Sequence, residues 1–141
     1  MYEGELSPGQ ELQTLVKASV TKVQLLRYAG ASGDDNLIHT DVETAKSVGL
    51  DGVIAHGMLS MGFLGQFLTD LAGPDGVKRL SVRFAGMVHL GDVISCKGVV
   101  RAVERQEGDR TRATLAIWAE NQQGERVTTG EAEIWLAVRQ R

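Results

Sequence analysis

The residues best suited to chemistry lie in one polar stretch, from 28 to 41 of the 141-residue chain. Within it, Asp34 and His39 are five positions apart in a segment rich in glycine and acidic residues. A carboxylate beside an imidazole fixes the tautomer of the ring, and the pair can exchange protons near neutral pH. An isolated Asp and His at this spacing more often form a turn and a packed histidine. Glycines and flanking helices favour a functional loop here.

A second candidate is the run His56-Gly57-Met58, which precedes a long apolar segment. The first amides of a helix lack an intrahelical acceptor and carry the positive end of the helix dipole. Gly57, without a side chain, would let a ligand oxygen approach its N–H closely. The alternative is a glycine needed only for tight packing.

The same regions hold side chains that bind divalent ions, but without a recognised ligand spacing. Solvated acids at a helix start explain the acidic residues equally well, and we predict no metal. The residues concerned are Asp34, Asp35, His39, Asp41 and His56.

Cys96 stands in a strand pattern with no activating neighbour, which indicates packing. His89 is predicted to be a surface residue.

Two helices are expected to hold the polar loop. Thr21 can cap a helix over residues 22–31, which the following glycines end. Thr40 and Glu43 have capping-box spacing for a second short helix, for which Gly49 supplies the left-handed cap. The loop is therefore predicted to be fixed at both ends.

A third helix, over residues 58–71, is apolar around almost its whole circumference, which predicts burial. Gly62 and Gly65 weaken it by about 1 kcal/mol each relative to alanine. Such glycines are expected where another backbone lies close. The central helix is therefore predicted to be enclosed.

The remaining segments alternate with a period of two, which is typical of strands. One strand ends near Ala18, and the others begin at Val77 or cover residues 93–103, 111–120 and 127–138, with turns at 91–92, 107–109 and 121–124. A meander of about four strands curled around the apolar helix gives an α+β fold, with a single domain over residues 1–141. Trp118 and Trp135 are predicted to lie in the core or an interface. An open sheet edge favours pairing of two copies, and we predict a dimer.

Composition excludes several classes of protein. With 15 basic and 18 acidic residues and no basic cluster, nucleic-acid binding has no electrostatic basis. The apolar runs are too short to cross a bilayer, and the first residues do not resemble a signal peptide, so we expect no membrane association and a cytoplasmic location.

The polar stretch closely resembles the signature of the MaoC-like (R)-specific enoyl-CoA hydratases, also called hydratase 2. The matching positions are Tyr28, Gly30 or Ala31, Ser32, Gly33, Asp34, Asn36, Ile38, His39 and Asp41, with Leu37 where the family has proline. Residues 55–59, 82–84 and 91–92 resemble later landmarks of the family. Chain length and the run Gly-Met-Leu-Ser-Met-Gly resemble the B subunit of mycobacterial (3R)-hydroxyacyl-ACP dehydratase, which raises the possibility of a heterodimer.

The resemblance implies a hot-dog fold, a curled antiparallel sheet around a central helix, usually as a homodimer. It also implies reversible syn addition of water to a trans-2-enoyl thioester of CoA or acyl carrier protein, giving the (R)-3-hydroxyacyl thioester without a cofactor. Asp34 and His39 would handle the water and protons, the Gly57 N–H would hold the thioester oxygen, and Asn36 and His56 would support the loop. A serine found in some members has no equivalent at Gly65.

The length of the acyl chain that the protein accepts would be set by a tunnel between helix and sheet. Its candidate residues are Met61, Phe63, Leu64 and Phe67. Two alternatives stay open at this point: an acyl-thioesterase, since thioesterases share the fold, and a binding or scaffold subunit that is inactive alone.

Overall fold

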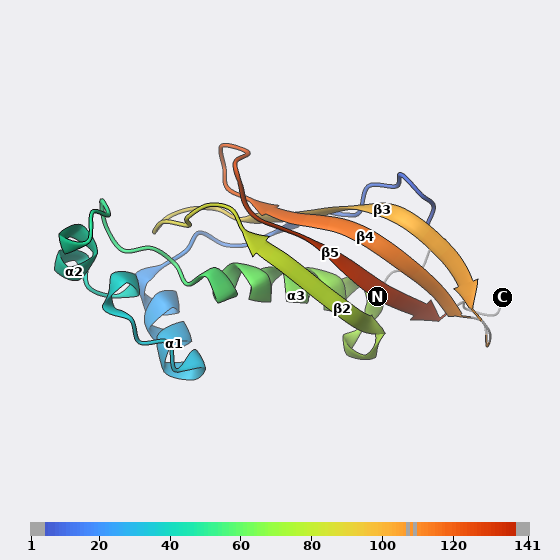
Figure 1. Cartoon of the computed structure of the whole chain (residues 1–141), viewed down its shortest axis with the longest axis horizontal. Coiled ribbons are helices and arrows are strands. Elements are labelled where there is room, and N and C mark those ends of the chain that lie inside the picture. Colours follow the sequence, from blue (N-terminus) through green and yellow to red (C-terminus); the bar gives the residue numbers. More distant parts are fainter. Residues whose placement is uncertain (1–4, 107, 109, 138–141) are drawn as a thin grey trace.

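The computed structural model describes residues 5–106, 108 and 110–137, and its elements are labelled in Figure 1. Within them the chain forms the helices α1 (Lys22–Ser32), α2 (Val42–Ser47) and α3 (Gly57–Ala72), the short 3-10 helices η1 (Leu37–His39) and η2 (Pro74–Gly76), and the strands β1 (Leu15–Val16), β2 (Val77–Phe84), β3 (Ser95–Gln106), β4 (Arg110–Glu120) and β5 (Arg126–Ala137). The predicted α+β element order is confirmed. Residues 107, 109 and 138, which belong to the predicted turn and last strand, lie outside the described residues.

The strands form one antiparallel sheet in the order β1-β3-β4-β5-β2. The meander prediction is right for β3 to β5 and wrong for β2, which pairs with β5 instead of β3. Residues 85–94 form no tight hairpin but carry the chain from one side of the sheet to the other. The first strand is shorter than predicted, because only Leu15 and Val16 pair with β3, with an isolated bridge between Glu11 and Val99 nearby.

The long helix α3 runs beneath the sheet, whereas α1 and α2 lie beyond one end of it (Figure 1). The side of α3 that faces the strands is buried, and so are the inward residues of β4. The residues concerned are Phe63, Leu64, Phe67 and Leu68 on the helix, with Ala113, Leu115, Ile117 and Ala119 on the strand. The inward side chains of β4, which alternate with outward ones as predicted, thus pack on α3. A curled sheet therefore covers one side of a central apolar helix.

The other side of α3 is open in a single chain, because the sheet covers one side only. Met58 and Gly62 are exposed, and no atom lies within 4 Å of a Cβ built on Gly62 or Gly65. The prediction that the sheet buries this helix on most sides, with a backbone against both glycines, is therefore wrong within the described part of one chain.

The two tryptophans lie on the outer face of the sheet, partly buried. The Arg126 guanidinium stacks 4.1 Å from the centre of the Trp118 ring, and Lys78 Nζ lies 5.6 Å from that of Trp135. The core alternative predicted for them is wrong, because the alternation that turns Leu115 and Ile117 inward turns Trp118 outward. None of the helices in the described residues is long and apolar enough to cross a membrane.

Candidate active site

The polar loop begins where α1 ends. Thr21 caps this helix as predicted, its hydroxyl accepting from the Gln24 N–H at 3.1 Å. At the other end, Gly33 adopts φ +76° and its N–H donates to the Ala29 carbonyl at 3.0 Å. A left-handed glycine turns the chain sharply out of the helix. The next residue, Asp34, thereby enters the loop.

A ladder of short-range hydrogen bonds orders the loop itself. The Asp34 N–H donates to Ser32 Oγ at 3.1 Å, and the Asn36 N–H to Asp34 Oδ1 at 3.4 Å. Asn36 Oδ1 then accepts from the Ile38 N–H at 3.2 Å and so caps η1. These Asx-type contacts are a local property of Ser, Asp and Asn side chains. They bring His39, at the end of η1, back toward Asp34.

The helix after the loop is capped one residue later than predicted. Asp41 accepts from the Thr44 N–H at 3.3 Å and from the Thr44 hydroxyl, and this second bond lowers the pKa of the carboxyl. Thr40 is instead the C-cap residue of η1, its N–H bound to the Leu37 carbonyl. Gly49 adopts φ +92°, as predicted for a left-handed residue after α2. The Asp41 carboxylate therefore serves as the N-cap of α2.

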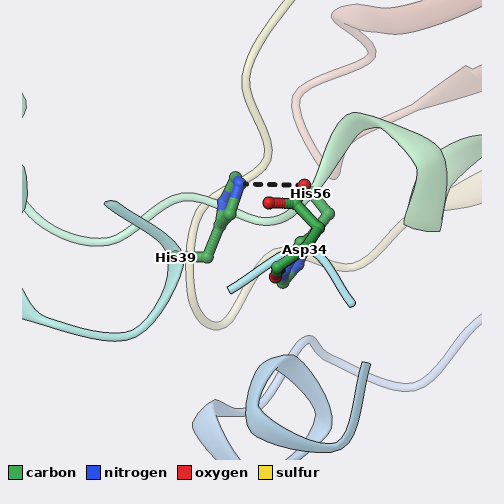
Figure 2. A group of neighbouring side chains, drawn as sticks. All are labelled: Asp34, His39 and His56. Atoms are coloured by element: carbon green, nitrogen blue, oxygen red, sulfur yellow. Dashed lines mark hydrogen bonds and ion pairs between the residues drawn. The ribbon is translucent and has the colours of Figure 1, made fainter. Parts of the chain in front are cut away.

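Asp34 and His39 are close together (Figure 2). His39 Nε2 lies 3.7 Å from Asp34 Oδ2, and the imidazole is buried while the carboxylate side chain is 52% exposed. His39 Nδ1 lies 2.7 Å from the Ile54 carbonyl oxygen. A carbonyl only accepts hydrogen bonds, so Nδ1 carries the proton, and in the neutral ring Nε2 presents its lone pair to Asp34.

His56 packs behind this pair and is buried. Its ring stacks on that of His39 at 3.8 Å between centroids, and the Tyr28 ring lies 4.7 Å from it at a tilt of 57°. His56 Nε2 donates to the Asp34 carbonyl at 3.0 Å, which leaves Nδ1 unprotonated and without a partner among the described residues. Burial lowers the pKa of His56, more than the bond to the Asp34 carbonyl raises it. The ring is therefore neutral near pH 7.

Gly57 begins α3, and its N-cap residue His56 makes no side-chain capping bond. The Leu59 N–H donates to the His56 carbonyl at 3.1 Å, whereas the Gly57 amide, directly after a residue of the cluster, retains the unpaired character of a helix N-terminus. A Cβ built on Gly57 would lie 3.2 Å from Phe84 Cδ1, so the Phe84 ring occupies the space beside the glycine. This contact gives the glycine a packing role, which is compatible with a free N–H.

Three of the five metal-ligand candidates gather. Asp34, His39 and His56 each bring one donor atom within 4.8 Å of the others, whereas Asp35 is not part of the group and Asp41 caps α2. One nitrogen of each ring is already hydrogen-bonded to a main-chain carbonyl. Of the tunnel candidates, Phe63, Leu64 and Phe67 are buried under the sheet and Met61 is partly exposed.

Comparison with known proteins agrees with this fold. The structure superimposes on the (R)-hydratase of A. caviae involved in PHA biosynthesis with a TM-score of 0.80 and 28% identity, over 93% of this chain and 97% of that one. An (R)-hydratase of Pseudomonas aeruginosa gives 0.79 and 31%, over 96% and 84%. These neighbours define the class as hot-dog-fold proteins, as predicted.

Residues 4–121 match the family model described as MaoC like domain, and the chain belongs to this family. It is 29% identical over 140 residues to an (R)-specific enoyl-CoA hydratase of Rhodospirillum rubrum, covering 98% of this chain and 93% of that protein. Over 73 residues, half of this chain and a quarter of the relative, it is 42% identical to 3-hydroxyacyl-thioester dehydratase X of Mycobacterium tuberculosis. Its named relatives are thus hydratases and a dehydratase.

Proposed function

We propose that this chain catalyses the reversible hydration of trans-2-enoyl thioesters to (R)-3-hydroxyacyl thioesters. The observation that carries the proposal is the orientation of His39, whose Nδ1 is bound to the Ile54 carbonyl while Nε2 faces the Asp34 carboxylate at 3.7 Å. That separation is too long for a direct hydrogen bond and leaves both groups able to bind one water molecule. Similarity to hydratases along nearly the whole chain supports this reaction.

In the proposed reaction, a water molecule is held by Asp34 and His39. It loses a proton to the pair as its oxygen bonds to C3 of the enoyl thioester, and the C2–C3 double-bond electrons move toward the thioester oxygen. The Gly57 N–H at the start of α3 stabilises the enolate oxygen, an effect worth about 3–4 kcal/mol per donor in acyl chemistry. The pair then returns the proton to C2 on the same face, which gives syn addition. Dehydration is the reverse.

Asn36 and His56 have supporting roles in this proposal. Asn36 holds the turn that leads to His39 through its bond to the Ile38 N–H. His56 holds the loop by donating to the Asp34 carbonyl and packs against the face of the His39 ring. Because His56 is neutral, it does not repel the positive charge that His39 acquires when it takes the proton.

The test uses Asp34→Asn and His39→Ala with crotonyl-CoA, following loss of the enoyl thioester absorbance and the chirality of the product. We expect each variant to lose about 100- to 10,000-fold in kcat, as for removal of a general acid–base group. Circular dichroism should stay near that of the parent in both variants. Asp34→Asn should keep the thermal midpoint because Asp34 is half exposed, whereas His39→Ala should lower it, because it removes a buried ring and leaves the Ile54 carbonyl without its donor. Retention of most activity in both variants would eliminate the proposal.

The same assay separates the alternatives. Release of free thiol in place of hydration identifies an acyl-thioester hydrolase. Turnover that is unchanged after dialysis against EDTA is expected, since the proposed steps use no metal. Parallel assays with enoyl-CoA and enoyl-acyl carrier protein identify the carrier, and a series of acyl lengths tests the tunnel proposed at Met61, Phe63, Leu64 and Phe67.

We propose that two copies form a homodimer. The open side of α3, with Met58 and Gly62 exposed, and the outer edges of the terminal strands β1 and β2 support this, because exposed apolar faces and sheet edges are usually covered. Light scattering on the purified chain should give twice its mass. A monomer that gains activity only with another hot-dog chain would indicate a heterodimer instead.

A further inference from the structure

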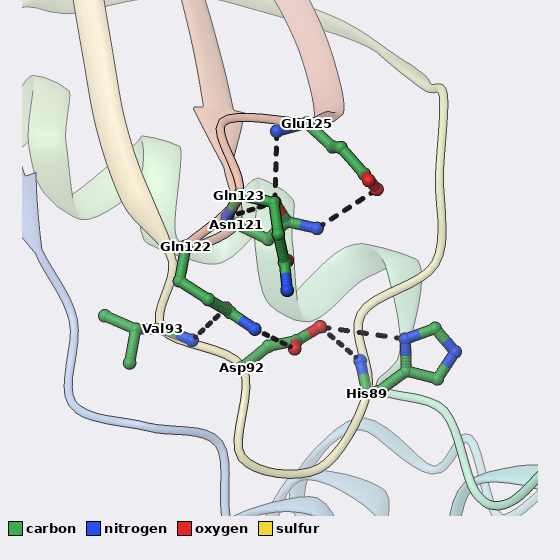
Figure 3. A network of polar contacts seen from close by, with 7 residues as sticks. All are labelled: His89, Asp92, Val93, Asn121, Gln122, Gln123 and Glu125. Carbon is green, nitrogen blue, oxygen red and sulfur yellow. Dashed lines mark hydrogen bonds and ion pairs between the residues drawn. The ribbon is translucent and has the colours of Figure 1, made fainter.

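Asp92 is a buried carboxylate outside the cluster of Asp34, His39 and His56. It follows the Gly91 turn in the connection from β2 to β3 and is 8% exposed. Figure 3 shows its contacts: Oδ2 accepts from the His89 N–H at 2.8 Å and lies 3.7 Å from His89 Nδ1, and Oδ1 accepts from Gln122 Nε2 at 2.9 Å. Gln122 Oε1 accepts in turn from the Val93 N–H at 3.0 Å. Asp92 thus ties this connection to the turn between β4 and β5.

The connection held by Asp92 contacts the segment before α3. The Ala55 N–H donates to the Val88 carbonyl at 2.8 Å, and Ile54 forms an isolated antiparallel bridge with His89. Ile54 lies outside the regular strands, so its main-chain direction depends on these contacts and on the bond from its own N–H to the Ile38 carbonyl at 3.2 Å; the Ala55 N–H belongs to the same peptide group as the Ile54 carbonyl and orients it directly. Its carbonyl is the acceptor for His39 Nδ1.

A continuous path therefore leads from Asp92 through the backbone of His89 and Ile54 to the His39 ring. We propose that Asp92 is a positioning residue for His39, which holds the Ile54 carbonyl where it selects the Nδ1–H tautomer. This inference rests on the proposed function for its effect on turnover. If the Asp92 contacts are lost, the 85–94 connection shifts, the bond from Nδ1 lengthens, and Nε2 no longer faces Asp34.

The hydrogen-bond pattern offers a test by exchange of donor and acceptor. In D92N the new amide oxygen can still accept from His89, but the new NH₂ group faces the NH₂ group of Gln122. In Q122E two carboxylates face each other. In the double variant D92N/Q122E, the amide introduced at 92 donates to the carboxylate introduced at 122, and the N–H groups of His89 and Val93 keep their acceptors. The double variant should therefore restore the connection.

Two measurements report on His39. Nitrogen-15 chemical shifts of its ring, taken without substrate, give the tautomer, and steady-state kinetics on crotonyl-CoA give kcat and KM separately. We expect each single variant to raise the fraction of Nε2–H tautomer and to lower kcat about tenfold with KM unchanged, since small misplacement of a catalytic group mainly slows the chemical step. D92N/Q122E should return both quantities to near the parent values.

The control is Ile134→Val, which trims a fully buried side chain of β5 that pairs across the sheet with Ala113 and Val77, at the strand end away from the β4–β5 turn. It should lower the thermal midpoint without changing the His39 tautomer or kcat. Single variants that lose stability but keep the parent tautomer and kcat would overturn the proposal, as would failure of a folded double variant to restore them. If a single variant does not fold, Gln122→Ala is the milder replacement, at an exposed residue. If the parent hydrates no enoyl thioester, the proposed function fails, while the tautomer still decides the role of Asp92.

Discussion

Replacing Leu37 with proline should stabilise the protein without slowing it. Leu37 is the first residue of η1, a position whose N–H has no acceptor within the turn, and its side chain is 53% exposed. Proline also requires an extended residue before it, and Asn36 already has φ −57° and ψ 123°. The native backbone therefore accepts the ring.

The size of the stabilisation expected for Leu37→Pro follows from its effect on the unfolded chain. Proline at a compatible site stabilises by about 0.4–1 kcal/mol because the unfolded state loses conformational freedom. For a chain of this size that corresponds to a rise of about 1–3 °C in the thermal midpoint. No hydrogen bond of the loop ladder is given up, because Ile38 and not Leu37 donates to Asn36 Oδ1.

The adjacent residue supplies a matched control. Ile38→Pro makes the same chemical change one position later, where it removes the N–H that donates to Asn36 Oδ1 at 3.2 Å. Loss of that bond alone should cost about 0.5–1.5 kcal/mol, and loss of the partly buried side chain adds to this. The two variants should therefore shift stability in opposite directions.

Urea unfolding followed by circular dichroism measures both free energies, and crotonyl-CoA hydration measures kcat. The expected result is a more stable Leu37→Pro with parent kcat and a less stable Ile38→Pro. A loss of stability in Leu37→Pro as large as that in Ile38→Pro would refute the reasoning, since it would mean that the loop backbone is not the one described here.

Three further outcomes follow from burial and close packing. The unfolding free energy should decrease as the pH is lowered from 7 to 5. Burial keeps the folded-state pKa of His56 below its ordinary value of about 6.5, so the ring takes up a proton in the unfolded chain first. In parallel urea titrations, His56→Gln should flatten this part of the pH dependence. Cys96, whose thiol pKa is raised by burial to about 11, should resist thiol reagents at pH 8 in the native protein and react fully in denaturant. Gly130→Ala should destabilise by about 3 kcal/mol in the same urea assay, because the new Cβ would collide with the Ser81 carbonyl of the adjoining strand, and a near-neutral result would contradict the described β2–β5 pairing.

The sequence predicted the parts of the fold that depend on local periodicity. The helix expected over residues 22–31 is α1 at Lys22–Ser32, and the strand expected at 111–120 is β4 at Arg110–Glu120. The choice of strand partner was not predictable in this way: β2 joins β5, which it meets only after the chain has formed β3 and β4. The side of α3 left open by the sheet was likewise missed, since composition does not show how far a sheet extends.

The candidate site was predictable where side chains within one loop carry it. The approach of Asp34 and His39 follows from their spacing and from short-range Ser, Asp and Asn contacts. The acceptor for His39 Nδ1 is the main-chain oxygen of Ile54, and such an atom has no residue type for a pattern to reveal. Asp92 was recognised as part of a turn and of a family landmark, but its role was not, because its link to the site passes through backbone atoms of two distant segments.

The same main-chain acceptors have an evolutionary consequence. The carbonyls of Ile54 and Asp34 that anchor the two imidazoles persist when the side chains at these positions change. The alignment of the rings is therefore encoded in the path of the chain. A substitution at Ile54 that keeps this path leaves the acceptor for His39 in place.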